Sequence, residues 1–407
     1  RKEKVMSTSI VYHTQNVRGF QLLRIEYGGG CVTAHVSQKS DKRVCAACGS
    51  PNVTPVFFKN RLIRGLMMGL RVFVLSVAVH RLRCRDCGAF RREPLPFLPT
   101  EQARHTRALE RFVVELRQHM SIAAIARVYH LDWKTIKNIE KRHLERKYRR
   151  VRLKDVRHLA LDEIHVGRKR YLTIAVDLDS GAVLHVVEGR DADCLREFAR
   201  RLKLSGARIE AVATDMAGGY GRWVREHFPA AAHVYDHFHV IKLMNEKVDE
   251  VRRQAAKDAS HAEGKLIKGK RWLLLRGEEN LDEEACRELD RLKEANEPIA
   301  TACILKEQLR WIYQECVDAD QAAVELNEWC RIADESEIGP LRTMANTIRQ
   351  HWQGILAYWD TRLTTGRLEG FNNKIRWLIR QAYGYRDDRY FFLKIFDLPQ
   401  VSLVRQL

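Results

Sequence analysis

Two stretches of this sequence carry side chains whose types and spacing are suited to metal chemistry. The first is a pair of Cys-x-x-Cys-Gly motifs, "CAACGS" and "CRDCGA", which contribute Cys45, Cys48, Cys84 and Cys87. A spacing of two lets both thiolates of a motif bind one ion, and two motifs supply the four sulfurs that Zn²⁺ prefers. A redox role is the alternative, but one Cys-x-x-Cys is enough for that. We therefore expect one structural Zn²⁺ held in a zinc ribbon.

The second stretch is "LALDEIHVG", in which an apolar run leads into adjacent carboxylates, Asp162 and Glu163. Side chains alternate between the two faces of a strand, so Leu159 and Leu161 share one face while Ala160 and Asp162 share the other. A small alanine beside Asp162 leaves room for a metal ion. Glu163 returns to the leucine face as a paired or solvated charge. The alternation favours Asp162 over Glu163 as a metal ligand.

The elements around this strand predict the fold that positions it. Three β-runs come first, "HLALDE", "KRYLTIAVDLD" and "AVLHVVEG". A helix, the strand "IEAVATD", a second helix, the strand "AHVYD" and a long amphipathic helix follow. This β-β-β-α-β-α-β-α order predicts an α/β fold, a mixed sheet with helices on both faces. The ribonuclease H-like fold has the same order of elements.

In a ribonuclease H-like fold the catalytic acids come from the first strand, the end of the fourth strand and a helix. Asp162 and Asp215 occupy the first two places, and the segment "GRLEGFNNKIRWLIRQAY" supplies Glu369. Helical periodicity places Glu369, Asn373 and Arg376 opposite the apolar stripe of this segment. A helix face that is merely solvated has the same pattern, so periodicity alone leaves the role of Glu369 open.

The segment "SIAAIARVYHLDWKTIKNIEKRH", residues 121–143, predicts a helix-turn-helix. Ser121 can cap a first helix with Ile122, Ile125 and Val128 on its apolar face. Asp132 can cap a second helix, on which Ile136 and Ile139 point inward. The outward side chains include lysine, threonine and asparagine, which suit phosphates and base edges: Trp133, Lys134, Thr135, Lys137, Asn138 and Lys141. An ordinary pair of helices with solvated charge is the alternative.

Charge favours a polyanionic partner. The formal net charge is +19 and the sequence pI is about 9.6. Residues 101–150 alone hold 13 Lys and Arg against 6 Asp and Glu. Such clustering is typical of nucleic-acid binding, although solubility is an alternative reason for a basic composition. No apolar run is long enough for a membrane span, so we expect no membrane partner. The cysteine pattern is unlike that of a secreted disulfide framework, so we expect a cytoplasmic protein.

Taken together, these motifs make the chain resemble the ISL3 family of insertion-sequence transposases. The resemblance rests on the cysteine motifs, the helix-turn-helix, "LALDEIHVGRKRYLTIAVDLDSG", "VATDMAGGYGRWVREHFPAAAHVYDHFHVIKLMN" and "TGRLEGFNNKIRWLIRQAYGYRD". It covers roughly residues 25–395 and implies a DDE transposase with Asp162, Asp215 and Glu369 as its acidic triad. The triad would bind two Mg²⁺ or Mn²⁺ ions, which stabilise both the attacking and the leaving oxygen in phosphodiester chemistry.

The resemblance also implies partners and supporting residues. The substrate is double-stranded DNA, both the terminal inverted repeats of the transposon and the target, and at least a homodimer is expected on DNA. Asp236 and His239 in "YDHFHV" are candidates for positioning phosphate or supporting the ligands, with helix capping as the alternative. Asn373 is a further auxiliary candidate, and Arg376 is a candidate DNA contact.

Five segments are expected: a β/zinc-ribbon domain (1–100), the helix-turn-helix (101–152), the first part of the catalytic core (153–254), an all-helical insertion (255–345) and the last part of the core (346–407). Two other functions fit parts of the pattern. One is a DNA-binding regulator without catalysis. The other is a ribonuclease H-like nuclease that cuts DNA without joining it.

Overall fold

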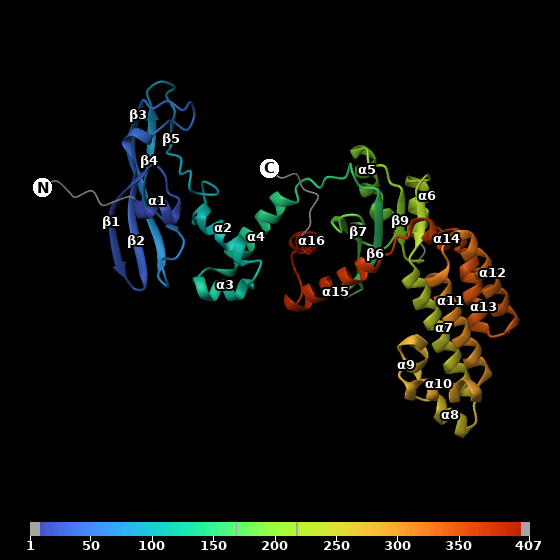
Figure 1. Ribbon diagram of the computed structural model, residues 1–407. Coiled ribbons are helices and arrows are strands. Elements are labelled where there is room, and N and C mark those ends of the chain that lie inside the picture. Colours follow the sequence, from blue (N-terminus) through green and yellow to red (C-terminus); the bar gives the residue numbers. More distant parts are fainter. Residues whose placement is uncertain (1–8, 168, 217–218, 400–407) are drawn as a thin grey trace. The chain divides into compact units, whose positions relative to one another are not determined.

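The computed structural model describes residues 9–167, 169–216 and 219–399. The chain forms two compact units, Arg1–Lys147 and Tyr148–Leu407, and each is described by itself (Figure 1). The predicted zinc ribbon and helix-turn-helix both belong to the first unit. Both parts of the predicted catalytic core and the predicted helical insertion belong to the second.

A five-stranded sheet forms the first part of the first unit. Its strands lie in the order β1-β2-β4-β3. β2 pairs with the first half of β4, and β5 pairs with the carboxyl-terminal end of β4. β2 and β4 are parallel, and the other pairs are antiparallel. The elements are α1 (Ser9–Gln15), β1 (Phe20–Gly28), β2 (Cys31–Gln38), the short 3-10 helix η1 (Ser40–Lys42), β3 (Val53–Arg64), β4 (Val72–Cys84) and β5 (Phe90–Arg92).

Three helices complete this unit: α2 (Arg107–Leu116), α3 (Ile122–Tyr129) and α4 (Trp133–Lys147). The Ser121 hydroxyl accepts the backbone N–H of Ala124, and Asp132 accepts that of Lys134, so both predicted caps are confirmed. Ile125, Ile136 and Ile139 are fully buried, as predicted. The prediction for Val128 was wrong. Its side chain is 49% exposed because the neighbouring helices cover the other side of α3.

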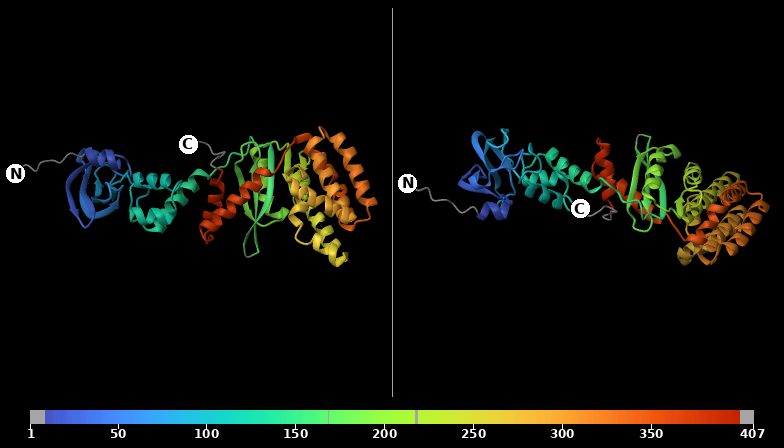
Figure 2. Two further views of the ribbon diagram at one scale, coloured as in Figure 1. Left: turned by 60° about the horizontal axis from the view of Figure 1, so that its bottom comes forward. Right: turned by 90° about the horizontal axis from the view of Figure 1, so that it is seen from above.

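The second unit is built on a mixed sheet in the order β10-β9-β6-β7-β8. The region of this sheet is drawn in green in Figure 2. The antiparallel meander of β6, β7 and β8 is followed by β9 and β10, which run parallel to β6. The strands are β6 (His158–Gly167), β7 (Arg170–Asp177), β8 (Val183–Glu188), β9 (Ala211–Thr214) and β10 (Ala232–Tyr235). The predicted order of strands and helices is confirmed.

Helices cover both faces of this sheet, and the alternation predicted for β6 separates the two cores. Leu159 and Leu161 pack with the 3-10 helix η2 (Ala192–Leu195), α5 (Arg196–Ser205) and α6 (Tyr220–His227). Ala160 and Ile164 pack on the other side with α15 (Gly366–Gln381) and α16 (Asp388–Asp397). Asp162 therefore belongs to the face that α15 covers.

A helical bundle lies between β10 and α15 in the sequence. Its members are α7 (His237–Asp258), α8 (His261–Ile267), α9 (Arg271–Leu275), the 3-10 helix η3 (Glu278–Asn280), α10 (Glu283–Ala295), α11 (Glu297–Glu315), α12 (Ala319–Glu335), α13 (Gly339–Gln350) and α14 (Trp352–Thr361). The α-helices share one continuous apolar core, to which η3 adds no buried residue. The boundary expected at residues 254 and 255 falls inside α7. No helix of the described residues is long and apolar enough to cross a membrane.

Two histidines of the second unit are held neutral by burial. His185 on β8 stacks on Phe198, with ring centroids 4.9 Å apart. His233 on β10 has Nε2 2.8 Å from the hydroxyl of Thr214. Burial lowers the pKa of both imidazoles to about 4, and a nearby arginine adds to each shift. Protonating either ring in the folded state is therefore unfavourable.

This burial makes stability depend on pH. A histidine in the unfolded chain has a pKa of about 6.5. Below that pH, His185 and His233 therefore bind protons in the unfolded chain but not in the folded chain. We expect the free energy of unfolding to fall as the pH is lowered from about 7 to about 5, by about 2 kcal/mol for each histidine. Chemical denaturation at both pH values measures it. His185→Gln should weaken the dependence, whereas the exposed control His165→Gln should not. Equal pH dependence in all three proteins contradicts the assignment.

Candidate active site and metal centre

Two parallel strands carry two of the predicted acids near the end of their pairing. β6 pairs with β9 through Leu159 opposite Val212 and Ala160 opposite Ala213. Asp162 and Asp215 each lie two residues after this last pair, Asp162 in the middle of β6 and Asp215 just after β9. Asp162 lies on the same face of β6 as Ala160, which packs against α15. These positions make Asp162 and Asp215 candidates for one acidic site.

Helix α15 closes this site through Asn372. The amide nitrogen Nδ2 of Asn372 donates to Oδ2 of Asp162 over 2.5 Å. Asn372 is only 5% exposed, and its Oδ1 is buried without a hydrogen-bond partner among the described residues. The neighbouring Asn373 is exposed and accepts a hydrogen bond from Arg376 instead. The sequence analysis selected Asn373 and missed Asn372, although the two differ by only one helical position.

Glu369 lies one turn before Asn372 on the same stripe of α15, and Arg376 lies one turn after it. Glu369 is exposed, in the first turn of the helix. The apolar stripe predicted for this helix is buried against the sheet at Leu368, Phe371, Ile375 and Leu378. Glu369 therefore lies beside the apolar stripe of α15 and is open to solvent.

The charge of Asp162 is controlled by its surroundings. Burial raises the pKa of this carboxyl above its ordinary value, although the backbone N–H of Glu163, the charge of His239, the Asn372 amide and the charge of Arg376 all lower it. A bound divalent cation would favour the ionised form far more strongly than these groups do. The surroundings of Asp162 thus suit a carboxylate that binds a cation better than one that stands alone.

Asp236 ties the start of α15 to the start of α7. It is only 1% exposed, and it accepts hydrogen bonds from the hydroxyl of Thr365 and from the backbone N–H of Phe238. Burial by itself raises the pKa of Asp236, but hydrogen bonds from His237 and Thr365 bring it below its ordinary value. Asp236 is therefore engaged in capping α7 and in fixing Thr365, which immediately precedes α15.

The three acids are not gathered as tightly as the cysteines. Within the described residues, the four cysteines form the one group of His, Cys, Asp or Glu side chains whose ligand atoms all lie within 4.8 Å of one another. Asp162, Asp215 and Glu369 are spread more widely. Two physical reasons account for the wider spread of the acids. Two metal ions lie about 3.5–4 Å apart, so their ligands occupy a larger region than the ligands of one ion. Carboxylates without a cation between them also repel one another.

The four cysteines have the geometry of a tetrahedral metal site. Cys45 and Cys87 have their Sγ atoms 3.7 Å apart, and those of Cys48 and Cys84 are 3.6 Å apart. Four sulfurs at the usual Zn–S distance are about 3.8 Å apart. Backbone N–H groups of Cys48 and Ala47 lower the pKa of Cys45. The backbone of Ser50 lowers the pKa of Cys48, but the neighbouring thiols of Cys87, Cys84 and Cys45 raise it above its ordinary value. A bound cation would favour the thiolate form of all four cysteines. This cluster could hold Zn²⁺ with no ligand position left open.

Local turns explain this convergence. Each second cysteine is followed by a glycine with positive φ, Gly49 at 76° and Gly88 at 73°. This conformation favours glycine and folds each motif back on itself. The long antiparallel pairing of β3 and β4, which places Val53 opposite Cys84, then brings the two motifs together. β4 leads directly into the second motif, since its last residue is Cys84.

On α4, the second helix of the helix-turn-helix, the side chains predicted to face outward differ in their exposure. Trp133, Lys134 and Asn138 are exposed, whereas Thr135, Lys137 and Lys141 are half-buried. The turn passes through His130, which has a left-handed backbone, and Ile136 and Ile139 are held in the core. The exposed positions are on the outer side of α4, as the pattern predicted.

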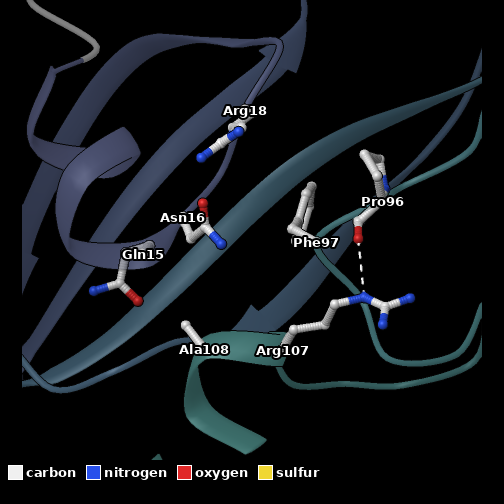
Figure 3. A pocket seen from close by; sticks show the side chains of 7 residues that line it. All are labelled: Gln15, Asn16, Arg18, Pro96, Phe97, Arg107 and Ala108. Carbon is white, nitrogen blue, oxygen red and sulfur yellow. Dashed lines mark hydrogen bonds between the residues drawn. The ribbon is translucent and has the colours of Figure 1, made fainter. Parts of the chain in front are cut away.

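A pocket of about 300 Å³ lies in the first unit between the end of α1 and the start of α2 (Figure 3). None of its seven lining residues is acidic, and Arg107 donates to the carbonyl oxygen of Pro96 across it. Gln15 at its wall is already engaged by the backbone of Leu66. This pocket therefore has no ligand set for a cation, and the acidic edge of the second unit remains the candidate active site.

Comparisons with known proteins agree with this geometry. Residues 159–395 match the DDE transposase family ISL3, and residues 93–144 match the helix-turn-helix domain of transposase family ISL3. The chain is 36% identical over 389 residues to the transposase for insertion sequence element IS1001 of Bordetella parapertussis, covering 93% of this chain and 95% of the relative.

A second relative is the transposase for insertion sequence element IS1557 of Mycobacterium tuberculosis, which is 29% identical over 310 residues. That match covers 70% of this chain and 69% of the relative. Among solved structures, the Drosophila P element transposase strand transfer complex is 13% identical with a TM-score of 0.38, covering 72% of this chain and 91% of that one.

The hydrogen bond from Asn372 to Asp162 gives a direct test. We expect Asn372→Ala to lower metal-dependent activity about 10- to 100-fold, because partners that orient a metal ligand have effects of this size. Asn373→Ala is the matched control and should change activity little. A Mg²⁺ titration of activity should show a raised metal requirement for Asn372→Ala only. Equal effects of the two substitutions contradict the assignment.

The cysteine cluster predicts one zinc ion per purified chain, measured by elemental analysis. Cys48→Ser should remove most of the zinc and lower the unfolding temperature of the first unit, since a closed zinc site contributes folding free energy. The scattered Cys286→Ser serves as control and should keep the metal. Full zinc content in the Cys48→Ser protein contradicts a four-cysteine site.

Proposed function

Because the chain belongs to the ISL3 family of DDE transposases, we propose that it binds the terminal inverted repeats of an insertion sequence, cleaves the DNA there and joins the ends to a target. The observation that supports this proposal is the parallel pairing of β6 and β9, with Asp162 and Asp215 each two residues beyond its last pair and Asn372 of α15 hydrogen-bonded to Asp162. The sheet topology and the acids fit a ribonuclease H-like catalytic core.

In this proposal Asp162, Asp215 and Glu369 hold two Mg²⁺ or Mn²⁺ ions. Carboxylate oxygens are the hard ligands that these ions require, and the buried Oδ1 of Asn372 offers a further oxygen at the site. Two bound ions supply charge stabilisation to both the attacking and the leaving oxygen of an in-line displacement at phosphorus. The family itself implies use of a divalent metal.

The remaining residues orient these ligands and the DNA. Asn372 fixes the rotamer of Asp162, and Asp236 fixes Thr365 and so the start of the helix that carries Glu369. Arg376 and His239 bring positive charge near Asp162, where a scissile phosphate would lie. No side chain has to form a covalent bond to the DNA in this scheme.

We propose that the helix-turn-helix reads the repeat through α4, with the cysteine cluster holding one structural Zn²⁺ in a zinc ribbon. On α4, the exposed side chains of Trp133, Lys134 and Asn138 are the candidates for phosphate and base contacts. Thr135, Lys137 and Lys141 extend the same helix. Two transposon ends must be held together for joining, so the active form on DNA is at least a homodimer.

Single substitutions of the acids test the catalytic assignment. Asp162→Asn, Asp215→Asn and Glu369→Gln should each keep DNA binding and lower cleavage by at least about a hundredfold. Removing a metal ligand should reduce activity more than removing a residue that only orients a ligand. Glu163→Gln is the matched control, since this acid lies on the opposite face of β6, and it should retain activity. Cleavage and strand transfer with Mg²⁺ or Mn²⁺ are measured on labelled duplexes carrying the element's own ends.

The same assay separates the alternatives. DNA binding without any metal-dependent cleavage by the unaltered protein supports a regulator and contradicts the enzyme. Cleavage without joining supports a ribonuclease H-like nuclease. Normal cleavage by Asp162→Asn contradicts the proposed triad.

A further inference from the structure

Three arginines and two phenylalanines form a compact cluster on the β3–β4–β5 face of the first unit. Arg83, Arg92 and Phe90 are exposed, and Arg81 and Phe58 are half-buried. Arg81 and Arg92 have their guanidinium carbons 4.5 Å and 4.9 Å from the ring centroid of Phe58. Arg81 and Arg83 lie 5.7 Å and 5.3 Å from that of Phe90. We call these five residues the arginine–phenylalanine surface. Its arginines are held over aromatic rings rather than free in solvent.

The strand register forces like charges together here. Arg81 of β4 lies directly opposite Arg92 of β5, and Arg83 lies opposite Phe90. Like charges in directly opposed positions destabilise a sheet. The crowding extends to Arg61 of β3, whose pKa is lowered by burial and further by the charges of Arg92 and Arg104. The isolated sheet therefore carries a repulsion that a bound polyanion would relieve.

Nearby acids do not neutralise this surface. Glu93, the residue after β5, is 3% exposed, and its carboxylate contacts Arg43 and His80 instead. Asp86 accepts hydrogen bonds from Ser50 and Asn52 within the cysteine motifs. In the part of the chain that the structure describes, no ion pair involves the three arginines of the cluster.

We propose that the arginine–phenylalanine surface is a second DNA-binding surface, which grips the phosphate backbone of duplex DNA beside the segment read by the helix-turn-helix. This inference rests on the proposed function and specifies where the DNA extends. A guanidinium held over a ring keeps its N–H donors at its edge and loses little freedom when it binds phosphate. Phe90 keeps 42% of its surface exposed, but arginines lie over both rings, and the three gathered guanidinium groups make the phosphate backbone the fitting partner.

Salt dependence measures such contacts. The full chain is titrated into a fluorescein-labelled DNA duplex of mixed sequence, over a series of salt concentrations, with fluorescence anisotropy as readout. Each phosphate contact adds about 0.9 to the slope of log K against log salt. We expect R81A/R83A/R92A to weaken binding and to lower this slope by up to about 2.7, the limit for three contacts.

The matched control is R200A/R331A/R349A, which removes the same formal charge from arginines that are ion-paired to Glu197, Glu328 and Asp334. It should leave the slope nearly unchanged. Equal slopes for the cluster variant and the control overturn the proposal. Zinc content and unfolding temperature of the cluster variant establish that its fold is intact.

A footprint on the unaltered protein needs no variant. Phenylglyoxal modifies accessible arginines, and mass spectrometry locates the modified sites. The duplex should protect Arg83 and Arg92 and leave Arg331 reactive. Equal reactivity of Arg83 and Arg92 with and without DNA overturns the proposal even if the cluster variant fails to fold.

A third protein, K134A/K137A/K141A, separates failure of this inference from failure of the proposed function. Loss of binding in this helix-turn-helix variant, with none in the cluster variant, overturns the second surface only. Absence of duplex binding by the unaltered chain overturns the proposed function itself.

Discussion

The parallel pairing of β6 with β9 is the constraint on which the proposed site depends. It joins segments more than forty residues apart in sequence, and its register places Ala160, two residues before Asp162, opposite Ala213, two residues before Asp215. A shift by one residue would turn Asp162 towards α5 and α6, where Leu161 now packs. The register is secured because both faces of β6 are buried, one against α5 and α6 and the other against α15. The apolar cores thus fix the geometry of the polar edge.

Helix α15 must be placed with similar accuracy, and it is held by both apolar and polar contacts. Its stripe from Leu368 to Leu378 packs on the sheet, while Asn372 reaches Asp162 and Thr365 is bound by Asp236. The polar contacts determine how the helix is turned and where it begins, because a packed stripe alone tolerates small rotations. The long bundle between α7 and α14 separates these contacts in sequence without separating them in space.

Local patterns predicted what depends on local physics. The caps at Ser121 and Asp132 and the two faces of β6 are confirmed, because each is set by residues a few positions apart. Asn372 was missed because periodicity could not resolve which of two adjacent asparagines faces Asp162; the docking angle of α15 decides that. Val128 was misassigned because periodicity does not show which side of α3 the neighbouring helices cover. The arginine–phenylalanine surface depends on the register of β4 with β3 and β5, which composition cannot reveal.

The central claim is that Asp162, Asp215 and Glu369 converge on bound metal. Iron(II)-directed hydroxyl-radical cleavage of the full chain tests it most directly, since Fe²⁺ substituted at a magnesium site cuts the polypeptide backbone near its ligands. The account predicts cuts at three places, the middle of β6, the end of β9 and the start of α15, all suppressed by excess Mg²⁺. Cuts confined to one of these places, or cuts that Mg²⁺ does not suppress, contradict it.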